Sequence, residues 1–307
     1  MIRYLVKNTG GFAFADAASP REEDGPSFGE WFAVEDAVLR FVEALRSAVG
    51  SRKIVVREPV LGVPLPEWLP DFRNGTVVSL EQAARLLRAA LRGVRIGCVL
   101  SLLADGSVLV GVDFDGVLRV DVDERHGLVL PDLLSEELGV VDQRPCPPPT
   151  GLQERTLDED FWRSVRELLP ERPDGLLVIE RWAYGDWGET WYLAATDTLD
   201  QVRRAVRENS LVIVQDLPDF EEIVLAQHFD GTSALALDDL DLRCLPAAHG
   251  DGPDLRIRPL RGAPADPALW QQPIKLVSPS STGHPPLLAA VAPGTVPGTA
   301  IAPWLAW

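Results

Sequence analysis

The chain has 307 residues, of which 46% are apolar, and its formal net charge is −17. This length and this apolar share are typical of one large or two ordinary folded domains. The acidic surplus argues against a nucleic-acid partner, because it repels phosphate groups at long range.

Composition also bears on localisation. No uninterrupted apolar run reaches the roughly 18 residues that a membrane span needs, and the N-terminal MIRYLVKNTGG has no apolar core long enough for a signal peptide. Three widely spaced cysteines, Cys98, Cys146 and Cys244, argue against a disulfide framework and favour a reducing compartment. We therefore expect a soluble cytoplasmic protein. Its three lysines against 26 arginines are associated with a high-GC bacterial genome.

The first half of the chain combines helices and strands. Residues 34–49 are predicted to form a helix, and its apolar face is made by Val38, Phe41, Val42, Leu45 and Val49. A strand is expected over residues 53–60. A second helix begins at Ser79, where Gln82 completes the spacing of a capping box. Three further strands are predicted over residues 96–104, 107–114 and 117–124.

A proline-rich stretch, residues 145–151, divides the chain. Consecutive prolines favour extended backbone and cannot continue a helix or a central strand. We therefore predict a first domain over residues 1–144 and a second over residues 152–262. The Pro/Gly-rich residues 263–307 are expected to dock on the body of the protein, and PIKLVSP within them is expected to add a strand.

The second half has the same kinds of element in the same order. A predicted helix over residues 157–169 places Asp158 and its acidic neighbours in the first turn, where the helix dipole favours acids. A strand over residues 175–184 follows, and then a helix that begins at Thr198 with Gln201 at the capping-box position. Three strands are predicted over residues 211–217, 222–229 and 233–239. The predicted fold class is α+β, with a mainly antiparallel sheet and two helices in each half.

Three pairs of similar segments, in the same order, indicate that the two halves are copies of one another. VVRE from Val55 resembles VIER from Val178, SLEQAARLLR from Ser79 resembles TLDQVRRAVR from Thr198, and DFDGVLRVDVDE from Asp113 resembles HFDGTSALALDD from His228. The offset changes by only a few residues from one pair to the next, as changes in loop length would produce. The sequence thus predicts two tandem, similar domains.

The stretch VDFDGVL, residues 112–118, resembles the first motif of the haloacid dehalogenase-type phosphatases. The resemblance implies that Asp113 would be the nucleophile and Asp115 the general acid. It covers about six residues, and no lysine lies between residue 115 and the Asp238–Asp239 pair, where that family needs one. Asp-Gly between two alternating strands is a strong hairpin signal, so we predict a hairpin. A Mg²⁺-dependent phosphotransfer site at the four aspartates is the alternative.

The segment ERWAYGDWGETWYLAA, residues 180–195, is unusually rich in aromatic side chains and is predicted to form a hairpin. Trp182, Trp191 and Tyr192 are expected to be buried. The partner-binding residues are predicted to lie at an exposed tip, where aromatic rings supply contact area and carboxylates select basic side chains. They are Tyr184, Asp186, Trp187 and Glu189.

No cofactor or metal site is predicted, because the motifs that mark such sites are missing. The histidines, His126, His228, His249 and His284, are scattered, and no glycine-rich phosphate loop or Gly-x-Ser-x-Gly elbow occurs. We therefore expect a non-catalytic protein-binding module, such as an immunity-type inhibitor, an adaptor or a chaperone. A basic surface on the partner would complement the acidic chain. The competing class is the phosphotransfer enzyme, which bound Mg²⁺ would stabilise.

Overall fold

The computed structural model describes residues 1–8, 28–103, 105–112, 117–135, 138–145, 155–185, 187–224, 242–245, 256–260, 273–277 and 286–294. The chain forms two compact units. The first unit consists of Met1–Gln153, Trp182–Gly188 and Gly294–Trp307, and the second consists of Glu154–Arg181 and Glu189–Pro293. The chain therefore passes from one unit to the other four times.

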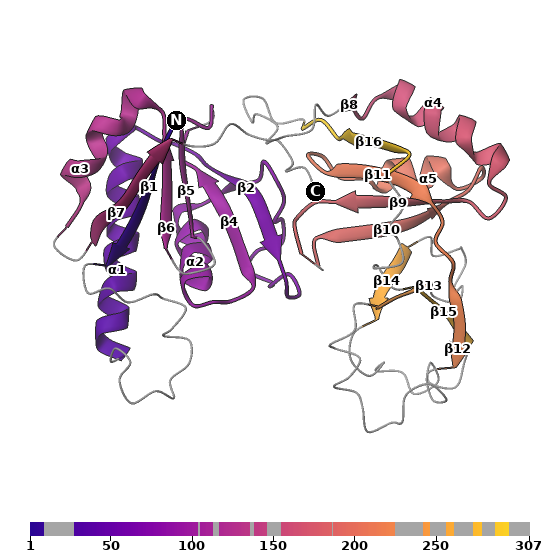
Figure 1. Ribbon diagram of the computed structural model, residues 1–307, viewed down its shortest axis with the longest axis horizontal. Coiled ribbons are helices and arrows are strands. Elements are labelled where there is room, and N and C mark those ends of the chain that lie inside the picture. Colours follow the sequence, from indigo (N-terminus) through magenta and orange to yellow (C-terminus); the bar gives the residue numbers. More distant parts are fainter. Residues whose placement is uncertain are drawn as a thin grey trace. The chain divides into compact units, whose positions relative to one another are not determined.

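The first unit is built on a seven-stranded sheet with the strand order β3-β2-β4-β5-β6-β1-β7 (Figure 1). Its neighbouring strands pair antiparallel. The strands are β1 (Ile2–Asn8), β2 (Ile54–Leu61), β3 (Val77–Val78), β4 (Ile96–Ser101), β5 (Val108–Val112), β6 (Leu118–Val122) and β7 (Leu138–Pro145). The helical elements are α1 (Phe28–Ala48), α2 (Leu80–Leu91), the 3₁₀ helix η2 (Glu124–Val129) and α3 (Leu130–Leu133).

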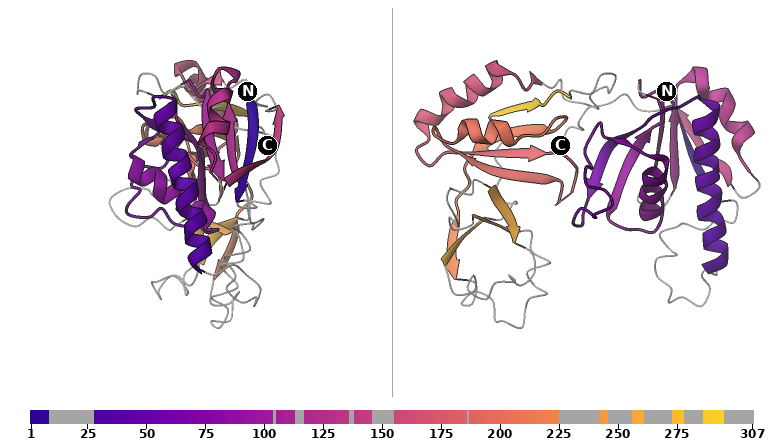
Figure 2. Two further views of the ribbon diagram at one scale, coloured as in Figure 1. Left: turned by 90° about the vertical axis from the view of Figure 1, so that its left-hand side faces the viewer. Right: turned by 180° about the vertical axis from the view of Figure 1, so that it is seen from behind.

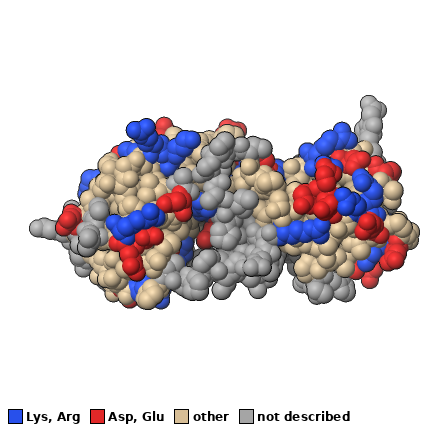
Figure 3. All heavy atoms as spheres, turned by 90° about the horizontal axis from the view of Figure 1, so that it is seen from above, with Lys and Arg blue, Asp and Glu red and all other residues tan. Residues whose placement is uncertain are grey.

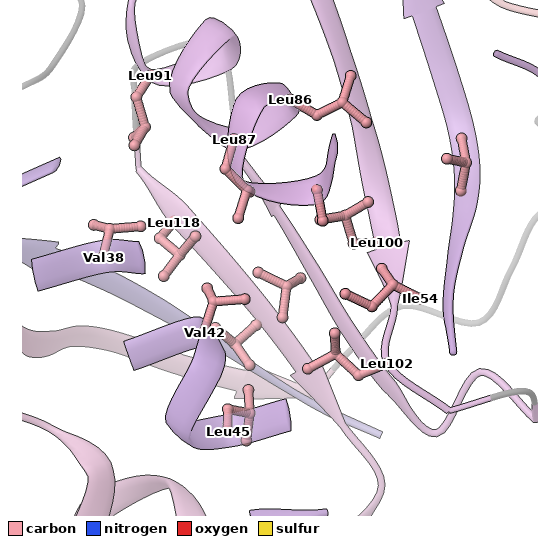
Figure 4. Close-up of a cluster of buried hydrophobic side chains, with 14 of the residues drawn as sticks. Val38, Val42, Leu45, Ile54, Leu86, Leu87, Leu91, Leu100, Leu102 and Leu118 are labelled. Atoms are coloured by element: carbon pink, nitrogen blue, oxygen red, sulfur yellow. The ribbon is translucent and has the colours of Figure 1, made fainter. Parts of the chain in front are cut away.

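Helices α1 and α2 pack on the same face of this sheet (Figure 2). The apolar face predicted for α1 is confirmed, because four of its five predicted members are buried and Val49 is partly buried. The side chains of both helices meet those of the sheet in one core (Figure 4). Burial of each large apolar side chain contributes about 1.5–3 kcal/mol. Labelled members of this core are Val38, Val42, Leu45, Ile54, Leu86, Leu87, Leu91, Leu100, Leu102 and Leu118.

Two local predictions for the first unit are confirmed. Helix α2 begins with a capping box, because Ser79 Oγ accepts a hydrogen bond from the N–H of Gln82 at 3.1 Å and the Ser79 N–H donates to Gln82 Oε1 at 3.0 Å. Strands β5 and β6 pair antiparallel with Val112 opposite Leu118, as expected for a hairpin. The residues between them, 113–116, lie outside the described part of the chain.

The second unit is built on a nine-stranded sheet with the order β12-β15-β13-β14-β10-β9-β11-β16-β8. Its described strand pairs are antiparallel, except for the parallel pair β16–β8. The strands are β8 (Arg155–Thr156), β9 (Leu176–Arg181), β10 (Glu189–Ala194), β11 (Leu211–Asp216), β12 (Glu221–Val224), β13 (Leu242–Leu245), β14 (Arg256–Leu260), β15 (Pro273–Val277) and β16 (Leu288–Val291). The helices are α4 (Glu159–Leu168), the 3₁₀ helix η3 (Leu169–Glu171) and α5 (Leu199–Ala205).

Helices α4 and α5 pack on one face of the second sheet, where Phe161 and Val165 are buried. Helix α4 is capped by Asp158, whose side chain accepts from the N–H of Phe161 at 2.9 Å. The capping box predicted at Thr198 is wrong. The backbone of Thr198 is already near helical, with φ −108° and ψ −12°, and its Oγ1 accepts instead from the N–H of Ala195 at 2.9 Å.

The C-terminal third contributes strands to the second sheet. The strand expected within PIKLVSP is confirmed as β15, and β16 pairs with β11. The strand predicted over residues 233–239 and the second Phe-Asp-Gly motif at residues 229–231 lie outside the described residues. The fold is therefore α+β with mainly antiparallel sheets, as predicted. Among the described residues, no helix combines the length and the apolar character that crossing a bilayer requires.

Candidate functional site

The four residues predicted to bind a partner have different surroundings. Tyr184 and Trp187 belong to the first unit and are half-buried, whereas Glu189 is the first residue of β10 in the second unit. Asp186 lies outside the described residues. Strands β9 and β10 pair antiparallel, so the predicted hairpin is confirmed.

The Trp182–Gly188 segment is hydrogen-bonded to β2 through its backbone. The N–H of Tyr184 donates to the carbonyl oxygen of Pro59 at 2.6 Å, and the N–H of Leu61 donates to the carbonyl oxygen of Tyr184 at 2.6 Å. The N–H of Trp187 donates to the carbonyl oxygen of Leu61 at 3.0 Å. Trp187 also packs against the apolar core of the first unit.

Burial and two glycines restrict the path of this segment. Trp182 and Ala183 are buried members of the first core. Gly185 has a φ of +87°, and a Cβ at this position would lie 2.8 Å from the carbonyl oxygen of Leu61. A Cβ at Gly188 would lie 2.1 Å from the carbonyl oxygen of Ala183. Both positions therefore require glycine, since any other side chain would clash with backbone atoms.

Glu189 is engaged by neighbours within the second unit. Its Oε1 accepts from both Arg181 Nε, at 2.7 Å, and Arg181 Nη2. Its Oε2 accepts from the indole N–H of Trp191 at 2.9 Å and from Arg243 Nη2 at 3.5 Å. The guanidinium of Arg243 also lies 4.2 Å above the Trp191 ring, where a cation is attracted by the π electrons. The Glu189 carboxylate thus holds together side chains from three strands.

The residues of the alternative Mg²⁺ site, Asp113, Asp115 and the Asp238–Asp239 pair, all lie outside the described residues. Within the part of the chain that the structure describes, no group of three or more His, Cys, Asp and Glu side chains could hold a metal ion.

Two buried carboxylates that the sequence patterns did not reveal are paired with arginines in the first unit. Asp121 is 2% exposed, and it accepts from Arg3 Nε at 2.7 Å and Arg3 Nη2 at 2.9 Å. Arg119 Nε lies 3.4 Å from the same carboxylate. Glu35 of α1 is held in the same way by Arg88 of α2 and by Arg92, the residue that follows α2, each at 2.9 Å. These pairs cross-link elements that are far apart in the sequence.

A third buried carboxylate, Glu180, accepts hydrogen bonds from neutral groups of the second unit. Its side chain accepts from the hydroxyl of Tyr192 at 3.0 Å, the N–H of Arg207 at 2.6 Å and the hydroxyl of Ser210 at 3.2 Å. Burial raises the pKa of the Tyr192 hydroxyl well above its usual range, and the negative charge of Glu180 raises that pKa further. Tyr192 therefore remains a hydrogen-bond donor at neutral pH.

The thiol of Cys98 is held in its protonated form. Cys98 packs against the first core, and burial raises the pKa of its thiol to about 12. We expect iodoacetamide at pH 9 to alkylate Cys98 more than about 100-fold more slowly in the folded chain than in urea, because the thiolate is the reactive species. Mass spectrometry of the Cys98 peptide measures both rates. Equal rates would contradict this placement.

Charged side chains of both signs are interspersed on the face drawn in Figure 3. In the second unit, α4 and α5 are joined by ion pairs of Arg203 with Glu159 and of Arg166 with Asp200. Exposed pairs of this kind contribute at most about 1 kcal/mol each. Much of the surface charge is thus neutralised locally, and the remaining surplus is acidic.

The outer edge of β7 is the most accessible apolar strand surface among the described residues. Strand β7 lies at the end of the first sheet and pairs with β1. A bulge in this pairing leaves Val141 as an extra residue, and the exposed fractions of Val140 and Val141 are 39% and 56%. The exposed Asp142 and Arg144 follow, 3.8 Å apart. An edge of this kind offers backbone donors and acceptors to a further strand.

Comparison of the chain with protein-family models, with curated proteins and with solved structures gives no match. Function is therefore inferred from the described residues.

Proposed function

We propose that the protein is a non-catalytic cytoplasmic protein-binding module that takes an extended segment of its partner at the outer edge of β7. The observation that carries this proposal is the exposure of Val140 and Val141 on an eight-residue edge strand. A strand added there would hydrogen-bond to the backbone of β7 and cover both valines. Masking a segment of another protein in this way suits an inhibitor, an adaptor or a chaperone.

The net charge of −17 favours a partner segment that carries basic side chains. Complementary charge raises the association rate and selects against acidic competitors. The partner-binding role of Tyr184, Asp186, Trp187 and Glu189 stays a prediction. Because Tyr184, Trp187 and Glu189 have extensive contacts within their own units, we favour β7 as the binding surface.

A non-catalytic role is supported by the state of three titratable groups among the described residues. A general base needs a lone pair that can reach a substrate proton, and a cysteine nucleophile needs the thiolate form. The carboxylates of Asp121 and Glu189 are bonded to arginines, and the Cys98 thiol is protonated at neutral pH. The two carboxylates thus serve as structural cross-links.

We also propose that the two units descend from one duplicated unit. In support, the elements α1, β2, β3, α2 and β4 correspond in order to α4, β9, β10, α5 and β11, and the first strand of each set lies between the other two. The side chains of Val56 and Val178 both face the helices of their own units. Equivalent residues must face the same side of a sheet, so Val178 corresponds to Val56. The sequence alignment of VVRE with VIER, which pairs Val178 with Val55, is therefore shifted by one residue. An experimental structure in which these five elements do not superpose would contradict duplication.

The proposed function predicts a specific loss of binding. Val141→Lys should weaken capture of a basic partner at least tenfold, because it places a like charge and a flexible chain on the binding edge. Val77→Lys is the matched control, since Val77 is 42% exposed on β3 at the opposite end of the same sheet. Both variants should retain the thermal stability of the wild type.

The measurement begins with pull-downs from the native host, quantified by mass spectrometry for the wild type and both variants. Any protein lost with Val141→Lys and retained with Val77→Lys is then purified, and its Kd for each form is measured. Identical sets of captured proteins for all three forms would refute binding at β7.

A further inference from the structure

Strand β2 has an edge that β3 leaves uncovered. Strand β3 pairs with Ile54 and Val55 at the start of β2. Beyond a bulge, Val60 and Leu61 pair with β4 on one side, and β3 does not pair with them on the other. The other side of Pro59–Leu61 would present backbone donors and acceptors to a further strand.

The Trp182–Gly188 segment occupies this edge as a turn, which is closed by the hydrogen bonds of the Gly188 N–H to Gly185 and of the Trp182 N–H to Gly188. Tyr184 forms a parallel bridge with Val60, through the hydrogen bonds of the Tyr184 N–H to Pro59 and of the Leu61 N–H to Tyr184. Backbone hydrogen bonds of this kind are the contacts by which a peptide joins the edge of a sheet. Because they involve backbone atoms, another segment that adopts the same turn could make them equally well.

Selectivity at this edge comes from the side chains and glycines of the segment. Trp182 is buried in the core and Trp187 packs against it, so two aromatic residues five positions apart anchor the bound segment. Between them, residue 185 has a φ of +87° and lies so close to Leu61 that a Cβ there would be 2.8 Å from the carbonyl oxygen. The edge therefore fits a turn with two aromatic anchors and a glycine between them.

We propose that Pro59–Leu61 of β2 is a second peptide-binding edge, which Trp182–Gly188 occupies as a built-in ligand. Its ligand in trans is a turn-forming segment of the same aromatic and glycine pattern, which competes with the built-in one. Four strands separate β2 from β7 in the sheet order, so this edge is tested independently of the proposed function.

The test weakens the built-in ligand and supplies a free one. Tyr184→Pro removes the N–H that donates to Pro59, and Tyr184→Ala is its control because it keeps that N–H. The probe is a fluorescein-labelled peptide with the sequence of residues 181–189, RWAYGDWGE. Fluorescence anisotropy should show a Kd for Tyr184→Pro at least tenfold lower than for the wild type or Tyr184→Ala. A peptide with Gly185→Val should bind none of the three proteins.

Hydrogen exchange provides the second measurement. In the wild type the amide of Leu61 should be protected, in Tyr184→Pro its exchange should accelerate about tenfold or more, and the free peptide should restore protection. If Tyr184→Pro unfolds the unit, Gly185→Val in the chain serves as the second weakened variant, because its Cβ meets Leu61. An unprotected Leu61 amide in the wild type, or a peptide that binds neither weakened variant, would overturn the proposal.

Discussion

Replacement of Glu180 by alanine should lower the free energy of unfolding of the second unit by about 4 kcal/mol. Glu180 is fully buried and accepts hydrogen bonds from Tyr192, Arg207 and Ser210. Alanine would leave these three donors without their acceptor in a site closed to water, and each such loss costs about 1–3 kcal/mol. Urea unfolding, followed by hydrogen exchange of the β9 and β11 amides, measures the change.

Glu180→Gln is the matched control for this prediction. The carboxamide oxygen can accept from the N–H of Arg207 and the hydroxyl of Ser210, and its amino group can donate to the Tyr192 oxygen once that hydroxyl rotates. The loss should therefore be about 1 kcal/mol. If alanine and glutamine cost the same, hydrogen bonding at this site does not determine stability.

Asp121→Ala should destabilise the first unit by about 3 kcal/mol. The substitution leaves Arg3 and Arg119 beside each other without the carboxylate that both now contact. Breaking a buried ion pair from one side typically costs 3–5 kcal/mol, and we expect the lower end because the side chains of both arginines are 17% exposed and reach some water. Urea denaturation of the wild type and the variant gives the difference.

The control for Asp121 is an exposed pair in the same sheet. Asp142 lies 3.8 Å from Arg144, and both side chains are about half exposed. Asp142→Ala should therefore change the free energy of unfolding by less than about 1 kcal/mol. An effect of Asp121→Ala as small as that of Asp142→Ala would show that the arginines find other acceptors.

The sequence predicted those parts of the fold that depend on local periodicity. The apolar face of α1, the capping box at Ser79 and the β5–β6 pairing all follow from residues that lie within about 15 positions of each other. Thr198 and Gln201 have the same spacing as Ser79 and Gln82, but the capping box predicted there does not form. The Thr198 hydroxyl accepts instead from the N–H of Ala195. Local patterns reveal which partners are available, and the backbone conformation selects among them.

Strands and sites that depend on distant partners could not be predicted in this way. The edge strand β7 runs to Pro145, where the proline-rich stretch begins. It forms a strand because it pairs with β1, which lies more than 100 residues earlier in the sequence. Asp121 and Arg3 are 118 positions apart, so no sequence window contains both. Likewise, the placement of Tyr184 depends on the gap that β3 leaves beside β2.

The return of the chain to the first unit at Trp182–Gly188 has a consequence for how the gene can be divided. A fragment that stops at Gln153 would contain every strand of the first sheet but would lack the side chains of Trp182 and Ala183, which are buried in its core. Recombination at the proline-rich stretch would therefore separate the first core from two of its own side chains.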